Sequence, residues 1–493
     1  MTRVGEPSRD PPVVIASQGG ANKPTATKNP EEETLRKILD DYVEHSSMHG
    51  IWKAAKTSPF SRAVWTVVLL CMICLCLFTF VSQLLFFLQF KTNTLVTVIE
   101  QPFLPFPAVT VCNYNSFRKS KALEKPSITK VLEQLFSLDR IFHINVYTTS
   151  TAEQSDDVDI LKELIDLAHT LEGMVVYCFW CGMRVDCKQH FVQTMTDVGV
   201  CYTFNSKNTT GDTPMLVRDA GSDCGLKLIL NIQRHEYFYG QGDSTGVKVL
   251  VHDPKEVPLV GQQGFSAAPG TTVIASIKLQ QELYASSPYG DCVDVSKRDF
   301  KNPLQYHDEY TYTGCKMEHR VNYIYSSCHC VQYFHPVGGR EICTTFDQVE
   351  CSRKAQENHT MYQLEQLSQD CPVTCEYNTF DEKLSWASFP AQHILDDLQT
   401  TFNMSAQAIS DNLVQLHIYY ENLAVHRQEQ TPAYTVGALF ADTGGEMGLC
   451  IGASLLTVVE LFELCGHLAA FSWKKITRHM FYKKPRSSLS KPI

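Results

Sequence analysis

Residues 444–463 constrain the fold more than any other part of this sequence. They open an apolar segment that ends near Trp473, yet four glycines interrupt them and two glutamates, Glu460 and Glu463, lie inside them. A glycine in a helix costs roughly 1 kcal/mol relative to alanine, and a carboxylate at mid-bilayer depth costs about 2.5–3.5 kcal/mol on insertion scales. Both features therefore require a compensating environment, and a water-filled pore is the simplest one.

The spacing of polar residues in this segment predicts a break in the helix. Glu460 and Glu463 lie about 60° apart on a helix, so one polar sector holds both. Ser454 falls on nearly the opposite side of an unbroken helix, and it joins that sector only if the helix unwinds near Gly452, Ala453 and Ser454. Unwound backbone at membrane depth is tolerated where it lines a water-filled cavity and offers carbonyl oxygens to a cation. The alternative is a dry helix–helix contact with neutral or snorkelling glutamates.

Two segments are long enough to cross a bilayer. Residues 63–88 contain no charged residue, and these 26 residues exceed the number that a span requires, which is about 20. The second span follows Tyr434. Seven lysines or arginines and no acid follow Trp473, and three basic residues closely precede the first span. Since basic flanks remain in the cytosol, we expect a multi-pass plasma-membrane protein with both termini inside and the loop outside.

The spans and the local composition divide the chain into five expected parts. The first thirty residues lack an apolar run after a basic start, so we expect no cleavable secretion signal. The expected parts are a cytosolic arm (1–62), a first transmembrane helix (63–90), an extracellular domain (91–433), a second transmembrane segment (434–473) and a basic cytosolic tail (474–493).

Cysteine usage also places the central loop outside. Of the 19 cysteines, fourteen lie in the loop and five lie in or beside the spans. An even number in an oxidising compartment predicts up to seven disulfides, and we favour these over zinc at the closely spaced cysteines. Three N-glycosylation motifs, at Asn208, Asn358 and Asn403, also lie only in this loop. The loop carries a net charge of −14, which would concentrate cations near a pore, although solubility explains it about as well.

The loop is expected to fold as an α+β domain. Short runs rich in β-branched residues predict strands near both membrane connections, at 95–99, 108–112 and 413–419, and further strands between them. Residues 302–375 are polar and helix-like, so disulfides rather than apolar burial should hold that lobe.

Three motifs resemble the degenerin/epithelial sodium channel family, most closely its acid-sensing and peptide-gated branches. They are FPAVTVCN at 106–113, GVCYTFN at 199–205 and the segment 444–463, and the resemblance extends over about residues 45–475. It implies an acid-sensing-channel-like homo- or heterotrimer in the lipid bilayer, with three second spans around one sodium-conducting pore. Amiloride sensitivity is implied as well.

The resemblance also implies roles for individual residues. Gly452, Ala453 and Ser454 match the selectivity filter, below which Glu460 and Glu463 would concentrate cations. The remaining positions are His49 and Gly50 (a re-entrant motif of the lower pore), Ala441 (the degenerin position, where a bulky residue favours the open state), Asp442 (an outer-vestibule acid), Glu446 (a further pore acid, replacing the usual glutamine), and Tyr289 with Phe90 (an aromatic contact coupling the ectodomain to the pore).

The disulfide pattern is likewise implied by the resemblance. One bridge of the acid-sensing pattern is missing, since its two positions fall near His319 and Gln369. The implied pairs are Cys112–Cys201, Cys181–Cys187, Cys292–Cys375, Cys315–Cys371, Cys328–Cys351 and Cys330–Cys343, and the remaining Cys178 and Cys224 would then pair with each other.

The stimulus that opens such a channel is less well specified. Where acid-sensing members carry clustered carboxylates, this chain has Arg353 and Lys354 before Glu357. Where they carry paired basic residues just outside the first span, this chain has Lys91 followed by Thr92. We therefore expect gating by an extracellular peptide or another ligand. Proton gating and constitutive activity within the same family are the alternatives.

Other classes of protein fit the sequence less well. An ATP-gated two-span trimer shares the topology but needs lysine-rich nucleotide contacts that we do not find. A two-span receptor or ectoenzyme does not need Glu460, and the chain contains no His-Glu-x-x-His, Gly-x-Ser-x-Gly or phosphate-loop motif. We expect no enzymatic activity, metal, cofactor or nucleic-acid partner.

Overall fold

The computed structural model describes residues 30–125, 160–207, 213–238, 244–335, 338–362 and 370–482. The chain divides into two compact units, one made of Met1–Gln89 with Tyr434–Ile493 and the other of Phe90–Ala433. We call them the helical unit and the central domain. The glycosylation motif at Asn208, residues 1–29 of the N-terminal arm and the end of the basic tail lie outside the described residues.

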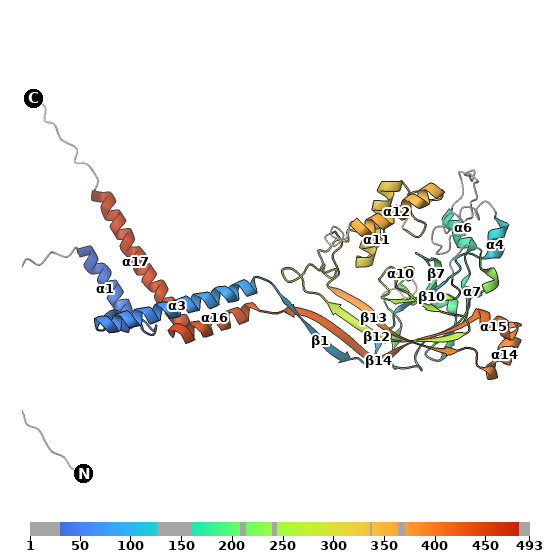
Figure 1. The fold of residues 1–493 in the computed structure, drawn as a ribbon, viewed down its shortest axis with the longest axis horizontal. Helices are drawn as coiled ribbons and strands as arrows, with labels where there is room; N and C mark the ends of the chain where they lie inside the picture. The colour runs from blue at the N-terminus through green and yellow to red at the C-terminus, as the bar shows by residue number, and fades with distance from the viewer. Residues whose placement is uncertain are drawn as a thin grey trace, which may run out of the picture. The chain divides into compact units, whose positions relative to one another are not determined.

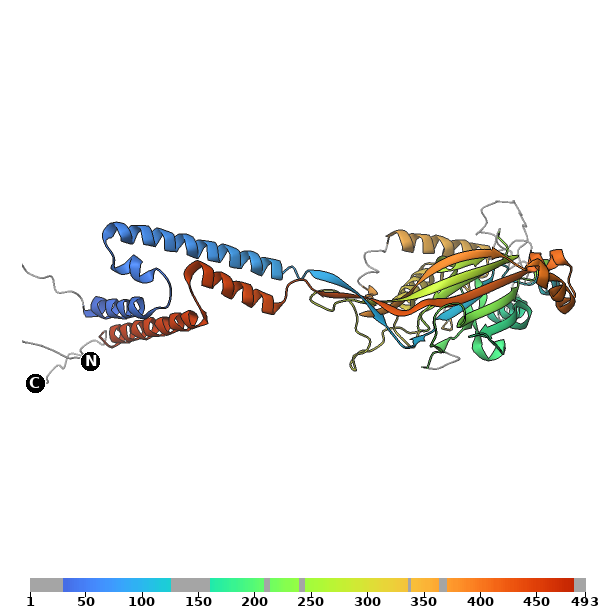
Figure 2. The ribbon, with the colours of Figure 1, turned by 90° about the horizontal axis from the view of Figure 1, so that it is seen from below.

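The helical unit contains both candidate membrane spans. Pro59–Phe87 and Leu455–Thr477 are long and apolar enough to cross a membrane. Figures 1 and 2 show α16 beside α3, whereas α17 turns away from α3 and runs beside α1. The helices of this unit are α1 (Pro30–His45), α2 (Ile51–Lys56), α3 (Pro59–Phe87), α16 (Val436–Ile451) and α17 (Leu455–Tyr482).

The central domain is built on two main sheets. The larger has the order β13-β12-β14-β9-β4-β5 with β1 also paired to β14, and the smaller has the order β11-β10-β3-β7-β6. A two-stranded sheet pairs β2 with β8. The strands are β1 (Thr92–Glu100), β2 (Leu104–Pro105), β3 (Ala108–Asn113), β4 (Val175–Trp180), β5 (Met183–Val185), β6 (Phe191–Thr196), β7 (Gly199–Phe204), β8 (Leu216–Val217), β9 (Gly225–Asn231), β10 (Val247–His252), β11 (Phe265–Ala267), β12 (Thr271–Leu283), β13 (Glu376–Ser388) and β14 (Leu413–Pro432).

Strand β14 organises the larger sheet. Its first seven residues pair antiparallel with β9, and its last nine pair antiparallel with β1, from Ala424 to Pro432. Along most of its length it also runs parallel to β12. Thus β1, which follows the first span, and the end of β14, which precedes the second, form one two-stranded connection. This agrees with the prediction of strands near both membrane connections.

The main core lies where the two large sheets meet. It joins buried residues of β3, β7 and β10 to residues of β4, β9, β12 and β14. Phe106, only 1 % exposed, packs edge-on against Trp180, Phe204 and Tyr420, with ring centroids 4.9, 6.2 and 6.1 Å away. The first predicted motif thus supplies the centre of this core.

The helices of the central domain lie around the sheets (Figure 1). α11 and α12 pack on each other, and a disulfide between Cys328 and Cys351 joins them. The elements are α4 (Lys119–Glu124), α6 (Ile160–Leu167), α7 (Leu171–Met174), α8 (Cys187–His190), η2 (Arg234–Glu236), α10 (Val260–Gln263), α11 (Tyr312–Cys328), α12 (Phe346–Tyr362), α14 (Gln392–Phe402) and α15 (Ala406–Asn412).

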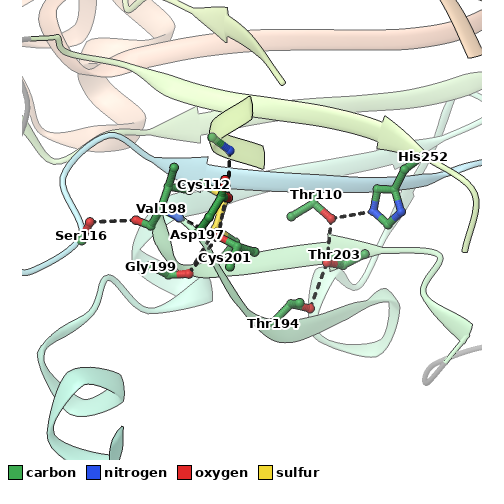
Figure 3. Close-up of a disulfide and its surroundings, with 12 residues drawn as sticks. Thr110, Cys112, Ser116, Thr194, Asp197, Val198, Gly199, Cys201, Thr203 and His252 are labelled. Carbon is green, nitrogen blue, oxygen red and sulfur yellow. Dashed lines mark hydrogen bonds between the residues drawn. A yellow bond between two sulfur atoms is a disulfide. The ribbon is translucent and has the colours of Figure 1, made fainter. Parts of the chain in front are cut away.

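Fourteen cysteines form seven disulfides in the central domain, and five pairings match those implied by the resemblance. In Figure 3 one of them, Cys112–Cys201, joins β3 to β7 directly beside the paired residues Val111 and Tyr202. The five confirmed pairs are Cys112–Cys201, Cys292–Cys375, Cys315–Cys371, Cys328–Cys351 and Cys330–Cys343.

The other two pairings are wrong. The structure joins Cys178 to Cys187 and Cys181 to Cys224, instead of Cys181 to Cys187 and Cys178 to Cys224. Strand register explains the exchange. Cys178 of β4 lies opposite Val185 of β5, so the hairpin brings Cys187 to it. The Cys181 amide donates to the Gly225 carbonyl where β4 meets β9, and this places Cys181 beside Cys224.

Candidate functional site

The second span breaks at the three residues that the sequence analysis singled out. α16 ends at Ile451, and Gly452 takes a left-handed conformation with φ 62°. The Gly452 and Ala453 amides donate to the carbonyls of Gly448 and Met447, which closes the end of α16. Ser454 then starts α17, because its amide donates to Thr457 Oγ1 at 2.9 Å. The helix therefore unwinds at Gly452, Ala453 and Ser454.

The segment before α2 folds back against this break. The His49 amide donates to the Ile451 carbonyl at 3.1 Å, and Gly50 has φ 91° at the start of α2. The imidazole occupies the space beside Gly452, since a Cβ added to that glycine would lie 1.5 Å from His49 Nδ1. A Cβ on Gly50 would lie 3.2 Å from Leu69 of α3. The His-Gly motif is thus held between the break and the first span.

A polar network ties the same segment to α17. Ser47 Oγ lies 2.6 Å from Thr457 Oγ1, and the Ser47 amide donates to Glu460 Oε2 at 3.0 Å. The Ser47 hydroxyl also donates to Glu460 Oε2, at 3.2 Å. Thr457 is only 3 % exposed, and its hydroxyl holds the Ser47 side chain. Ser47 in turn orients the Glu460 carboxylate. Sequence reasoning missed Ser47, whose contact with Glu460 spans more than 400 positions.

The second glutamate of α17 is placed differently. Glu463 is exposed and lies 3.8 Å from His467 Nε2, one helical turn further on. The two acids therefore differ in their contacts, since Glu460 accepts hydrogen bonds from the backbone and hydroxyl of Ser47.

The acids of α16 also have partners. Asp442 Oδ2 accepts a hydrogen bond from the Tyr434 hydroxyl at 2.6 Å. Glu446 lies between α16 and α3, where Gln83 Nε2 donates to its Oε1 at 2.6 Å. Gln83 was not predicted, although a glutamine within an uncharged span was the available signal.

One face of α16 is left open by the rest of the chain. Ala441 is exposed, and ideal Cβ atoms on Gly444 and Gly445 would meet nothing within 4 Å. Leu449 on the same helix is 88 % exposed. Among the described residues, nothing covers this small-residue face, so it is available to water or to another helix.

The two predicted coupling residues lie together in the central domain. The rings of Phe90 and Tyr289 meet edge to face, with centroids 5.4 Å apart and planes at 89°. Phe90 is the first residue of that unit and follows directly on the helical unit in the chain. The contact is present, and its role in coupling stays a prediction.

The remaining predicted positions are two exposed glycosylation motifs. Asn358 lies on α12 and Asn403 follows α14, and both side chains are exposed. Among the described residues, no group of three or more His, Cys, Asp or Glu side chains could hold a metal ion.

Comparison with known proteins gives a consistent result. The family model described as amiloride-sensitive sodium channel matches residues 42–464. Acid-sensing ion channel 1B of Danio rerio is 29 % identical over 485 residues, covering 96 % of this chain and 84 % of that protein. Acid-sensing ion channel 2 of Homo sapiens is 30 % identical over 463 residues, covering 88 % of each.

Among solved structures, the cryo-EM structure of a proton-activated chloride channel aligns with a TM-score of 0.30 and 6 % identity, covering 84 % of this chain and 98 % of that one. A similarity this low supports no argument. The family match and the two sequence relatives cover the spans, the break and the central domain alike. The chain therefore belongs to the amiloride-sensitive sodium channel family, the degenerin/epithelial sodium channel family of cation channels.

Proposed function

We propose that this chain forms a trimeric, sodium-preferring cation channel that opens in response to an extracellular ligand. The observation that carries the proposal is the break at Gly452, Ala453 and Ser454, with Glu460 held just below it. Three copies around one axis would surround an aqueous path with backbone carbonyls, Ser454 hydroxyls and carboxylates, which suit a partly dehydrated cation. The open face of α16 supports this assembly, because small residues allow close approach of water or helices.

The disulfides support the proposed orientation. Since disulfides form in an oxidising compartment, the seven bridges of the central domain favour its location outside the cell, with both termini in the cytosol. The exposed motifs at Asn358 and Asn403 suit the same side.

The local charges of α12 favour a ligand other than the proton. Arg353 pairs with Glu350 at 3.0 Å and with Glu357, and Lys354 pairs with Glu350 at 3.0 Å. These acids are already neutralised within one helix, and the Arg353 and Lys354 partners hold the pKa of the Glu350 carboxyl below its usual value. Carboxylates that bind protons on mild acidification would instead lie close to one another and away from cations, because their mutual repulsion raises their pKa values.

A cavity beside α11 is a suitable place for an extracellular peptide. It has a volume of about 250 Å³ and its lining includes Tyr284, Tyr312, Tyr377, Lys316 and Arg320. Aromatic faces bind apolar or cationic side chains, and paired cations bind a carboxylate.

Recording from cells that express the chain tests the proposal. Acid steps and a panel of neuropeptides separate peptide gating from proton gating, and currents without any stimulus would indicate constitutive activity. Sodium-selective, amiloride-blocked current is expected under at least one peptide. If none of these conditions gives a cation current while the chain is at the surface, the channel assignment fails.

Two substitutions test the assigned positions. Ala441→Trp is expected to give a standing inward sodium current, whereas Ala470→Trp, at an exposed alanine of α17, should not. Glu460→Gln is expected to weaken selection of cations over anions. Glu124→Gln, which removes an exposed carboxylate paired with Lys121, is its control. Intact selectivity in Glu460→Gln would restrict the filter to Gly452, Ala453 and Ser454.

A further inference from the structure

The cavity beside α11 has a lining whose charge is opposite to that of its domain. Its volume is about 250 Å³, and α11 lines it together with Tyr284, just after β12, and Tyr377 of β13. Among the described side chains that line it are two cations, Lys316 and Arg320, and no aspartate or glutamate. The extracellular loop as a whole carries a net charge of −14. A local excess of positive charge in such a domain favours an anionic ligand.

One side of α11 supplies both cations. Tyr312, Lys316 and Arg320 follow one another at intervals of four residues, so they lie on the same side of the helix. Lys316 Nζ lies 4.8 Å from the centre of the Tyr312 ring, a contact that orients the ammonium group. Like charges four residues apart repel each other and destabilise a helix. An anion bound between them would remove this repulsion.

The acids around the cavity do not neutralise these cations. In the described part of the chain, neither Lys316 nor Arg320 has a carboxylate oxygen within 4.0 Å, and Arg320 Nε has no hydrogen-bond acceptor. Burial lowers the pKa of the Arg320 guanidinium more than Asp197 raises it. The acids have other partners: Asp197 accepts from the Gly261 amide at 2.9 Å, Glu256 interacts with Thr313, and Glu282 accepts from the Tyr284 hydroxyl.

The rest of the lining favours an organic anion over an inorganic one. A monatomic ion would fill only a small part of a cavity of about 250 Å³. Three tyrosine rings and the side chains of Leu259, Met317 and Val373 form much of the wall. Such a wall fits the apolar or aromatic body of a ligand, while a few polar groups fix its charged end.

We propose that this cavity binds the carboxylate of an acidic peptide, with Lys316 and Arg320 contacting the carboxylate and the tyrosine rings surrounding the neighbouring apolar group. The inference rests on the proposed function and deepens it, since it names the class of peptide that would open the channel. An aspartate or glutamate side chain and a free C-terminus offer the same chemistry, so the experiment separates these two sources.

Titration of the purified full-length chain in lipid nanodiscs, followed by saturation-transfer NMR, measures binding directly. The probes are acetyl-Phe-Asp amide, acetyl-Phe-Leu with a free C-terminus, and the neutral acetyl-Phe-Asn amide, which differs from the first by one functional group. At least one acidic probe is expected to bind at least tenfold more tightly than the neutral one, and which one does so identifies the source of the carboxylate. Equal binding of all three probes, or binding of none, would overturn the proposal.

Two substitutions locate the binding in the cavity. Lys316→Gln and Arg320→Gln should each lower the affinity for the acidic probe about tenfold, from the loss of a charge-assisted hydrogen bond, and leave the neutral probe unaffected. The matched control is Lys121→Gln, which removes an exposed lysine paired with Glu124 and should change neither affinity. Unchanged affinity for the acidic probe in both cavity variants would contradict the assignment. If a variant fails to fold, the comparison of probes on the wild type still decides.

Inorganic anions are the competing occupants. Replacing chloride by methanesulfonate, or adding inorganic phosphate, should leave the affinity for the acidic probe nearly unchanged. Displacement of the probe by chloride or phosphate would make the cavity an inorganic-anion site and overturn the proposal.

Current recordings separate this inference from the proposed function. If the acidic probe binds but no peptide opens a cation current, the proposed function fails and the binding site stands. If a peptide-evoked current persists in the variant that carries both Lys316→Gln and Arg320→Gln, and the acidic probe does not bind to the wild type, the inference fails and the proposed function stands.

Discussion

Replacing Gly452 by alanine tests whether the His-Gly segment and the helix break form one unit. The new Cβ would lie 1.5 Å from His49 Nδ1, so the imidazole must move. A left-handed alanine costs about 1 kcal/mol, and the displaced segment would lose hydrogen bonds of about 1 kcal/mol each to Ile451, Thr457 and Glu460. The expected cost of Gly452→Ala is therefore about 4 kcal/mol.

A double-mutant cycle with His49→Ala separates these terms. Without the imidazole the clash disappears, so Gly452→Ala should cost only about 1 kcal/mol, leaving a coupling of about 3 kcal/mol between the two positions. The cycle is measured as thermal stability of the four purified full-length variants, with current per surface-expressed chain as a second readout. Equal effects of Gly452→Ala in both backgrounds would refute the packing argument.

Three further predictions concern the central domain. Burial raises the pKa of Glu256 to about 7, so its folded form prefers the proton and loses stability as the pH rises from about 4.5 to 7. Glu256→Gln should therefore increase the free energy of unfolding at pH 8 by up to about 3 kcal/mol, seen as a higher melting temperature, and leave it nearly unchanged at pH 4. A larger gain at pH 4 than at pH 8 would contradict the proposed direction of the pKa shift. Peptide mapping of the non-reduced protein should recover Cys181 linked to Cys224, and a fragment linking Cys181 to Cys187 would contradict the strand register. Tyr289→Ala should reduce ligand-evoked current while leaving surface expression unchanged, whereas Tyr289→Phe, which keeps the ring against Phe90, should restore it.

Local patterns in the sequence predicted much of this fold. The uncharged run 63–88 became α3, and the β-branched runs at 95–99, 108–112 and 413–419 all lie in strands. The helix break followed from the angular separation of Ser454 and Glu463. These features depend on residues that are close in the chain, where periodicity and composition carry the information.

Contacts between distant segments could not be predicted in the same way. Cys178 and Cys181 are three residues apart, and which one reaches Cys224 depends on the register of β4 against β9. The observed register places Trp180 opposite Leu226, which brings Cys181 beside Cys224 and leaves Cys178 opposite Leu228. The contacts of Ser47 with Glu460 and of Gln83 with Glu446 join segments that are far apart in the sequence and share no pattern, so only the packed structure reveals them.

The pairing of β1 with the end of β14 has a mechanical consequence. Every residue from Thr92 to Glu100 has a partner between Ala424 and Pro432, and the Ala433 amide adds a bond to the Lys91 carbonyl. The strand ends that lead into the two spans are thus hydrogen-bonded to each other. We therefore expect a movement of one of these strands to displace the other as well.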